Sequence, residues 1–180
     1  PWGRGPSKGR DKAAPGWPES VEMYLCPTNS GKTHRSLDFL AKIGSGCYAG
    51  PLRALAWEVR HSVEARAKKV WGEHPPTVGL WTGEESRDPD APVLCCTAEV
   101  APSHGNVLVL DEAHWCADPQ RGHAWTRLLL AARSGRYRHV RICGPVQSEP
   151  LLRRVFEKHD HAVTVHRTQR RSRLHFERDP

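Results

Sequence analysis

The 180-residue sequence predicts an α/β fold, with a mostly parallel β-sheet and helices on both of its faces. Short apolar runs rich in β-formers alternate with longer stretches that have helical spacing. Parallel strands need a crossover connection, and a helix is the usual one. Polar residues follow two of the apolar runs directly, as expected where ligands gather at the carboxyl ends of parallel strands.

The individual elements follow from the same patterns. The segment 1–20 is rich in proline and glycine, which oppose helix and strand alike, so we expect a flexible leader there and a folded domain over 21–166. Strands are expected at 21–25, 46–50, 77–81, 93–96, 106–111, 139–144 and 162–166. Helices are expected at 31–42, 53–70, 121–133 and 148–158.

The net charge of +7 lies mostly at the two ends of the chain. Residues 1–12 carry four basic and one acidic side chain, and residues 166–180 carry five basic and two acidic ones. A basic end is usually just solvated, so the charge is weak support for a polyanionic partner. No apolar run approaches the roughly 18 residues of a membrane-spanning helix, and no membrane association is expected. The six cysteines form no Cys-x-x-Cys pair, which predicts reduced thiols rather than a zinc site.

The stretch "CPTNSGKT" at 26–33 fits most of the phosphate-loop pattern G-x-x-x-x-G-K-[ST]. In that pattern a strand leads into a loop whose backbone N–H groups face phosphate oxygens, and the following helix adds its positive end. Cys26 replaces the first glycine, where the backbone often turns sharply, but cysteine is small enough to be tolerated. An ordinary polar turn is the alternative. The candidate nucleotide-binding residues are Pro27, Thr28, Asn29, Ser30, Gly31, Lys32 and Thr33.

A second motif, "NVLVLDEAHW", places Asp111 and Glu112 at the end of an apolar strand. If that strand neighbours the one before the phosphate loop, Asp111 can hold magnesium, and Glu112 can orient and deprotonate a water aimed at the γ-phosphate. The alternative is a helix N-terminus whose carboxylates complement the helix dipole. Both motifs occur in this order, each on its proper element, which predicts nucleoside-triphosphate binding.

The pair "PTNSGKT" and "DEAH" resembles the first RecA-like P-loop NTPase domain of a superfamily-two helicase. The stretches "YAGPLRALAWEV", "WTGEE", "CCTAEV" and especially "DPQRGHAWTRLLLA" resemble the mitochondrial ATP-dependent RNA helicases of the RNA degradosome and their bacterial relatives. The resemblance covers about residues 21 to 175. It departs in three places: at Cys26, at the acidic motif, which in this family is closer to Asp-Glu-Ile-Gln, and at the motif before the last strand, which reads "ICGPV".

The resemblance implies ATP and Mg²⁺ as cofactors. It implies that Lys32 and Thr33 hold phosphates and metal, that Asp111 holds metal, and that Glu112 is the catalytic base. It further implies that His114 and the segment 143–145 link the nucleotide state to domain movement, and that the RNA backbone lies along Pro51, Arg53, Thr82, Gly83 and Thr97. Contacts to the phosphate backbone fix register without reading sequence.

The resemblance also implies partners and a location. RNA is the expected nucleic acid, with DNA or an RNA–DNA hybrid as alternatives, and the protein partner is an exoribonuclease or polynucleotide phosphorylase in a degradosome. The location is the mitochondrial matrix in a eukaryote and the cytoplasm otherwise. Segment 167–180 is expected to be a basic linker toward a second RecA-like domain that lies outside this sequence. The 180 residues alone are therefore expected to bind nucleotide weakly and hydrolyse it slowly.

Two other functions stay open at this point. A nucleoside kinase of the thymidine kinase type also combines a Ser-Gly-Lys loop with Asp-Glu-Ala, but it usually carries a zinc ribbon of paired cysteines, which this sequence lacks. A degenerate RecA-like module that binds RNA without ATPase activity is the other. Without the resemblance, Pro51 ends a strand, Arg53 is a solvated helical residue and Thr82-Gly83 is a simple turn. Trp115 and Trp125 are expected to pack in the core.

Overall fold

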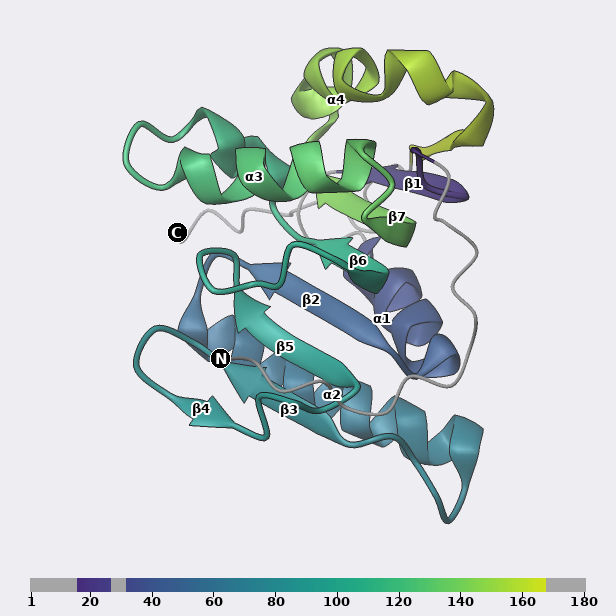
Figure 1. Ribbon diagram of the computed structural model, residues 1–180, viewed down its shortest axis with the longest axis vertical. Coiled ribbons are helices and arrows are strands. Elements are labelled where there is room, and N and C mark those ends of the chain that lie inside the picture. Colours follow the sequence, from purple (N-terminus) through teal and green to yellow (C-terminus); the bar gives the residue numbers. More distant parts are fainter. Residues whose placement is uncertain (1–15, 27–31, 168–180) are drawn as a thin grey trace, which may run out of the picture.

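The computed structural model describes residues 16–26 and 32–167, and it contains one eight-stranded sheet in the order β4-β3-β5-β2-β6-β7-β1-β8 (Figure 1). Every neighbouring pair is parallel except β3 and β4. The expected mostly parallel sheet is therefore confirmed. The strands are β1 (Ser20–Leu25), β2 (Gly46–Gly50), β3 (Val78–Trp81), β4 (Ser86–Arg87), β5 (Val93–Thr97), β6 (Gly105–Leu110), β7 (Tyr137–Gly144) and β8 (Val163–His166).

Helices cover both faces of this sheet, as expected. One face packs against α1 (Lys32–Ile43) and α2 (Arg53–Trp71), and the other against α3 (Gly122–Arg133) and α4 (Glu149–Phe156). Three 3₁₀ turns, η1 (Ala113–Ala117), η2 (Val146–Ser148) and η3 (Glu157–Ala162), complete the described elements. The helix expected at 148–158 ends at Phe156 and continues as η3. In the part of the chain that the structure describes, no helix is long and apolar enough to cross a membrane.

The core lies in two layers because strand side chains alternate between the faces of a sheet. In β2, Cys47 and Ala49 join the cluster beneath α3 and α4, whereas Tyr48 joins the cluster beneath α1 and α2. Trp125 of α3 is fully buried and Trp115 of η1 packs against the same cluster, so both tryptophans pack with the core as expected. All six cysteines are free thiols, and all but Cys116 are buried.

The strand that leads to the phosphate loop and the strand that leads to the acidic motif are not neighbours. β7 lies between β1 and β6, so the condition that these two strands are direct neighbours is not met, although all three end at the same edge of the sheet. Two strand spacings separate their ends by about 10 Å, which leaves a gap between the two motifs of the size of a phosphate group with its ligands. The expected strand 106–111 also stops at Leu110, which puts Asp111 in the loop beyond the sheet.

α3 begins close to η1, and a glycine makes this approach possible. A Cβ placed on Gly122 would lie 2.5 Å from the carbonyl oxygen of Cys116 and 3.1 Å from that of Trp115. Both obstacles are backbone atoms and cannot swing aside. The first turn of α3 is thereby pressed against the turn that follows the acidic motif.

We expect Gly122→Ala to lower the free energy of unfolding by about 1–3 kcal/mol, because the added methyl group must push α3 and η1 apart. Urea denaturation measures the change. The matched control is Gly83→Ala, since a Cβ there meets nothing within 4 Å, and its effect should stay within about 0.5 kcal/mol. Equal stability of the two variants would contradict the close packing of α3 on η1.

Candidate functional site

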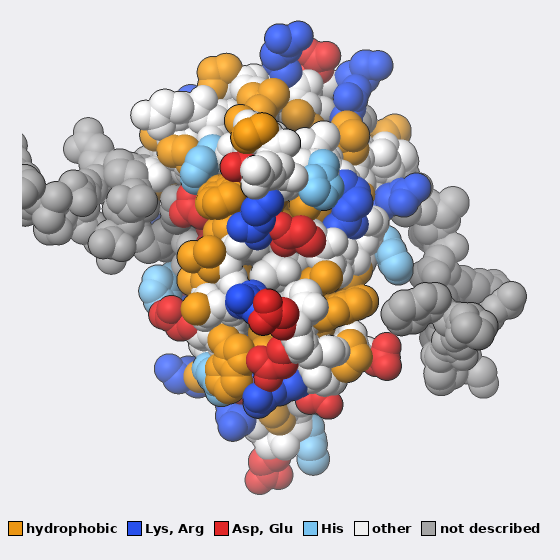
Figure 2. All heavy atoms as spheres, turned by 90° about the vertical axis from the view of Figure 1, so that its left-hand side faces the viewer, with side chains coloured by type: hydrophobic (Ala, Val, Ile, Leu, Met, Phe, Trp, Pro, Cys, Tyr) orange, Lys and Arg blue, Asp and Glu red, His pale blue; other side chains and the backbone are white. Residues whose placement is uncertain are grey.

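The carboxyl ends of the parallel strands share one edge of the sheet, on the left in Figure 1, and the loops that follow them divide into two groups. Asp111 follows β6 and Pro145 follows β7, while α1 begins a few residues after β1; these three strands lie side by side. Pro51 follows β2, Thr82 follows β3 and Ala98 follows β5, and these strands are neighbours too. Figure 2 faces this edge and shows acidic and basic side chains interspersed rather than a continuous basic surface.

In the first group of loops, the side chain of Asp111 is buried and hydrogen-bonded. It is only 4% exposed. The Tyr48 hydroxyl donates to its Oδ2 at 3.0 Å, and the backbone N–H of Glu112 donates to its Oδ1 at 3.0 Å. Burial, and next the charge of Asp111, raise the pKa of Tyr48 well above its usual value, so the hydroxyl keeps its proton and remains a donor. The carboxylate therefore has a fixed orientation at the end of β6.

The main chain of Asp111 is anchored as well. Its N–H donates to the carbonyl oxygen of Ala49 in β2 at 2.9 Å, and its own carbonyl oxygen accepts a hydrogen bond from Trp125 Nε1 at 3.0 Å. Neither Tyr48 nor Trp125 was expected to support this residue. Both lie in stretches that carry the helicase resemblance, but no spacing rule connects them to Asp111.

Glu112 has a backbone conformation that is unusual for its residue type. With φ 49° and ψ 52° it lies in the left-handed region, which costs on the order of 1–3 kcal/mol in a residue other than glycine and is found most often at functional sites. Its side chain is 25% exposed, and Glu112 Oε2 lies 3.2 Å from His114 Nδ1. The structure thus brings together Glu112 and His114, two of the predicted catalytic residues.

The entrance to the phosphate loop is well packed. Cys26 is buried, and its N–H donates to the carbonyl oxygen of Gly144 at 3.1 Å. Among the described residues, those with positive φ other than glycine are Asp88 and Glu112, so Cys26 does not need the conformation that favours glycine. A cysteine at this position therefore introduces no backbone strain of the kind that glycine relieves. Lys32 and Thr33 form the first turn of α1. The predicted phosphate-binding residues Pro27, Thr28, Asn29, Ser30 and Gly31 lie outside the described residues.

The predicted RNA-binding residues lie on three adjacent loops but differ in exposure. Thr82 is 3% exposed and Thr97 is 6% exposed. The hydroxyl of Thr82 accepts a hydrogen bond from the N–H of Glu85 at 3.1 Å, so it shapes its own turn. Pro51 is buried, whereas Arg53 and Gly83 are exposed.

Arg53 is exposed but paired. Its guanidinium forms an ion pair with Glu84. Both residues line an open hollow of about 570 Å³, which Trp57 and Thr82 also line. Arg53, the one cation among the predicted RNA-binding residues, is thus already paired with a carboxylate.

Comparison with known proteins decides the family. The family model described as the DEXQ-box helicase domain of Suv3 matches residues 14–168. The chain belongs to the Suv3 helicase family. It is 34% identical over 168 residues to "ATP-dependent RNA helicase SUV3, mitochondrial" of Saccharomyces cerevisiae, and 36% identical over 137 residues to "DExH-box ATP-dependent RNA helicase DExH18, mitochondrial" of Arabidopsis thaliana.

These Suv3 relatives are much longer than the present chain. The first alignment covers 89% of this chain and 21% of the yeast protein, and the second covers 74% of this chain and 16% of the plant protein. The chain therefore spans about a fifth of the length of the curated relatives it matches. At the fourth position of the acidic motif the chain has His114, where the name of the family model gives glutamine.

Solved structures confirm the RecA-like helicase fold. A hypothetical ATP-dependent RNA helicase from Sulfolobus tokodaii superimposes with a TM-score of 0.63 at 14% identity, over 83% of this chain and 48% of that one. The Hef helicase domain of Pyrococcus furiosus gives a TM-score of 0.59 at 17% identity, over 86% of this chain and 36% of that one. At these identities the likeness establishes the fold alone.

If Asp111 holds the metal as expected, Tyr48→Phe should raise the Mg²⁺ concentration needed for half-maximal nucleotide binding about tenfold, because the carboxylate loses the donor that orients it. A titration with a fluorescent ATP analogue at several Mg²⁺ concentrations measures this. Tyr137→Phe is the matched control, since the Tyr137 hydroxyl donates to the carbonyl of Pro102, far from the carboxyl edge. An unchanged Mg²⁺ requirement in Tyr48→Phe would show that Asp111 does not need this support.

Proposed function

We propose that this chain is the ATP-binding first RecA-like domain of an ATP-dependent RNA helicase. The observation that carries the proposal is the placement of the two motifs: α1 begins after β1, and Asp111 and Glu112 leave β6 at the same edge, with only β7 between these strands. The family and the names of the relatives support the same function.

The residues at this edge fit a metal-bound triphosphate. Asp111 is a buried carboxylate with a fixed orientation, and Thr33 supplies a hydroxyl in the first turn of a helix whose N-terminus favours anions. Thr33 and Asp111 would hold Mg²⁺, which when bound neutralises charge on the phosphates. Lys32 and the amides of 27–31 would hold the phosphates themselves.

The second carboxylate, Glu112, would then act on water. Glu112, at the end of β6, takes the proton of the attacking water, and His114, which contacts Glu112 Oε2, fixes the direction of that carboxylate. The left-handed backbone of Glu112 aims its side chain differently from the side chain of Asp111, so that one carboxylate serves the metal and the other serves the water.

RNA is the proposed nucleic acid, held along the loops after β2, β3 and β5. Thr82 and Thr97 are buried, so the loops would offer mainly backbone groups and the Arg53 guanidinium to the phosphates. Such contacts are insensitive to base sequence. DNA or an RNA–DNA hybrid is the alternative substrate, and the proposal extends to an exoribonuclease or polynucleotide phosphorylase as partner. The names of the relatives support a mitochondrial location.

The two other candidate functions make different demands. A thymidine-type kinase would transfer phosphate to a nucleoside, and the family match favours the helicase. A module without ATPase activity would bind RNA but not nucleotide. Equilibrium binding of a fluorescent ATP analogue to the chain and to Lys32→Ala separates these: loss of binding in the variant supports the ATPase, and no binding by the unchanged chain supports the inactive module.

We expect Glu112→Gln to keep nucleotide affinity within about threefold and to slow single-turnover ATP hydrolysis by about 100-fold or more, since the amide cannot accept the proton of water. Rapid-quench measurement of the hydrolysed fraction tests this. Glu73→Gln, on the exposed segment after α2, is the control and should change neither quantity. Full hydrolysis by Glu112→Gln would remove this residue from the role of base.

We expect Glu84→Gln to tighten binding of a single-stranded RNA by about two- to fivefold. In the unchanged chain Arg53 must break its ion pair with Glu84 before it can contact an RNA phosphate, and in the variant it need not. Fluorescence anisotropy at low salt measures the affinity. Glu58→Gln, on α2 at the rim of the same hollow, controls for the general loss of a negative charge. Equal gains in both variants would indicate that net charge alone is responsible.

A further inference from the structure

We propose that Arg121 is a positioning residue that couples two parts of the sheet edge. One is the acidic motif after β6, on the nucleotide side, and the other is the loop after β2, on the RNA side. The inference rests on the proposed function, because it assigns Asp111 to the nucleotide and the loop at Pro51 to RNA. Arg121 belongs to "DPQRGHAWTRLLLA", the stretch that carries the helicase resemblance most specifically.

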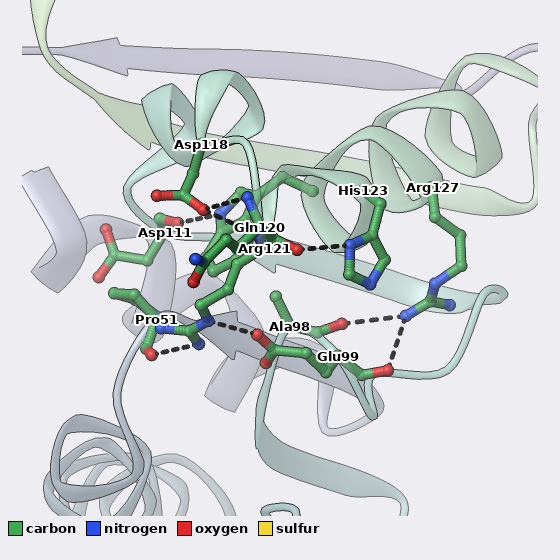
Figure 3. A network of polar contacts seen from close by, with 10 residues as sticks. Pro51, Ala98, Glu99, Asp111, Asp118, Gln120, Arg121, His123 and Arg127 are labelled. Carbon is green, nitrogen blue, oxygen red and sulfur yellow. Dashed lines mark hydrogen bonds and ion pairs between the residues drawn. The ribbon is translucent and has the colours of Figure 1, made fainter.

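On the RNA side, Arg121 holds two loops together (Figure 3). Its Nη2 donates to the carbonyl oxygen of Pro51 at 2.7 Å, and its Nε donates to Glu99 Oε1 at 2.7 Å. Glu99 comes two residues after Thr97, at the end of β5. Burial raises the pKa of Glu99, but hydrogen bonds, that from Arg121 first, and the charge of Arg121 outweigh burial and lower it, so Glu99 remains a carboxylate at neutral pH.

On the nucleotide side, the same guanidinium lies over two stacked indoles. Its carbon is 5.0 Å from the ring centre of Trp115 and 5.6 Å from that of Trp125. The two rings are 5.7 Å apart and inclined by only 24°. Trp125 Nε1 in turn donates to the carbonyl oxygen of Asp111 at 3.0 Å. The main chains of Asp111 and Pro51 are thus joined through two side chains, Trp125 and Arg121.

The backbone that carries Arg121 is fixed. Asp118 Oδ1 accepts hydrogen bonds from the N–H groups of Gln120 at 2.9 Å and Arg121 at 2.7 Å, and Gly122 lets α3 press against η1. Arg127, further along α3, donates to the carbonyl oxygen of Ala98 at 2.9 Å (Figure 3). It also donates to the carbonyl oxygen of Ala101 at 3.0 Å. α3 is therefore clamped to the loop after β5.

On the other side of Arg121 lies η1. It begins directly after the left-handed Glu112, is a short 3₁₀ turn, and carries both His114 and Trp115. Because strained residues such as Glu112 cluster at switch regions, we place the moving part of the coupling at η1. A change at Glu112 that accompanies binding or hydrolysis would move Trp115 beneath Arg121, and the guanidinium would transmit that movement to the carbonyl of Pro51.

A purely structural arginine and a coupling arginine predict different results. If Arg121 only holds the loops in place, its replacement would weaken RNA binding equally with and without nucleotide. A coupling residue changes the ratio of the two affinities, and this ratio measures the interaction free energy between the sites. The experiment therefore measures the Kd of a fluorescein-labelled single-stranded RNA by anisotropy, with and without saturating non-hydrolysable ATP analogue and Mg²⁺.

For the unchanged chain we expect the nucleotide to alter the RNA Kd about fivefold or more. Arg121→Gln should bring this ratio below about twofold, while the Kd of each ligand measured alone changes less than about threefold. Arg121→Lys should also lose most of the ratio, because an ammonium keeps the charge but not the planar stack and fork. Arg133→Gln, in the last turn of the same helix, is the matched control and should keep the ratio.

The outcomes separate this inference from the proposed function. An unchanged ratio in Arg121→Gln, or a ratio of one in the unchanged chain, overturns the coupling role while leaving ATP and RNA binding intact. Failure of the unchanged chain to bind either ligand overturns the proposed function itself, and the coupling role with it. If thermal melting shows that Arg121→Gln does not fold, Glu99→Gln decides: it should reduce the ratio at least twofold, and an unchanged ratio overturns the inference.

Discussion

The site depends on hydrogen bonds at the carboxyl end of β2, the strand on which the two halves of the sheet edge meet. The carbonyl oxygen of Ala49 accepts from the N–H of Asp111, and that of Gly50 accepts from the N–H of Ala98. One bond holds the end of β6, which carries the acidic pair, and the other holds the end of β5, which carries the loop at Thr97. Because β2 pairs in parallel with both neighbours, it fixes the height at which both loops leave the sheet.

Tyr48, on the same strand, supports the side chain of Asp111. Its ring lies in the core beneath α1 and α2, and its hydroxyl reaches the carboxylate of Asp111. A tyrosine can do both because its ring is apolar and its tip is polar. The metal-binding carboxylate that we propose is thus supported from within the core rather than from a loop, which limits its movement.

Most of the fold could be predicted from the sequence. Apolar runs bounded by turn residues predicted the long strands, and helical spacing predicted the four helices. Both signals arise because buried side chains recur at a regular spacing along a strand or a helix. β4, with two exposed residues, has no apolar pattern and was missed. The turn η1 was also missed, since its left-handed start at Glu112 follows from tertiary packing and has no glycine to mark it.

The candidate site was predictable only in part, for the same physical reason. Asp111, Glu112 and His114 stand together in the chain, so a local motif was enough to find them. Tyr48, Trp125 and Arg121 act on them from other elements, and only the folded sheet brings them close. The exposure of the predicted RNA-binding residues was likewise out of reach, because burial of Thr82 and Thr97 depends on how their loops close.

The distribution of thiols has a practical consequence. Five of the six cysteines are sealed within the sheet or beneath its helices, whereas Cys116 is partly open to solvent on η1, beside a small apolar cavity that also involves His114 and Leu151. Burial raises the pKa of Cys116, so it reacts slowly rather than indiscriminately. Alkylation of the native protein would therefore modify Cys116 on η1 first, and the rate of this modification would report how η1 responds to ligands.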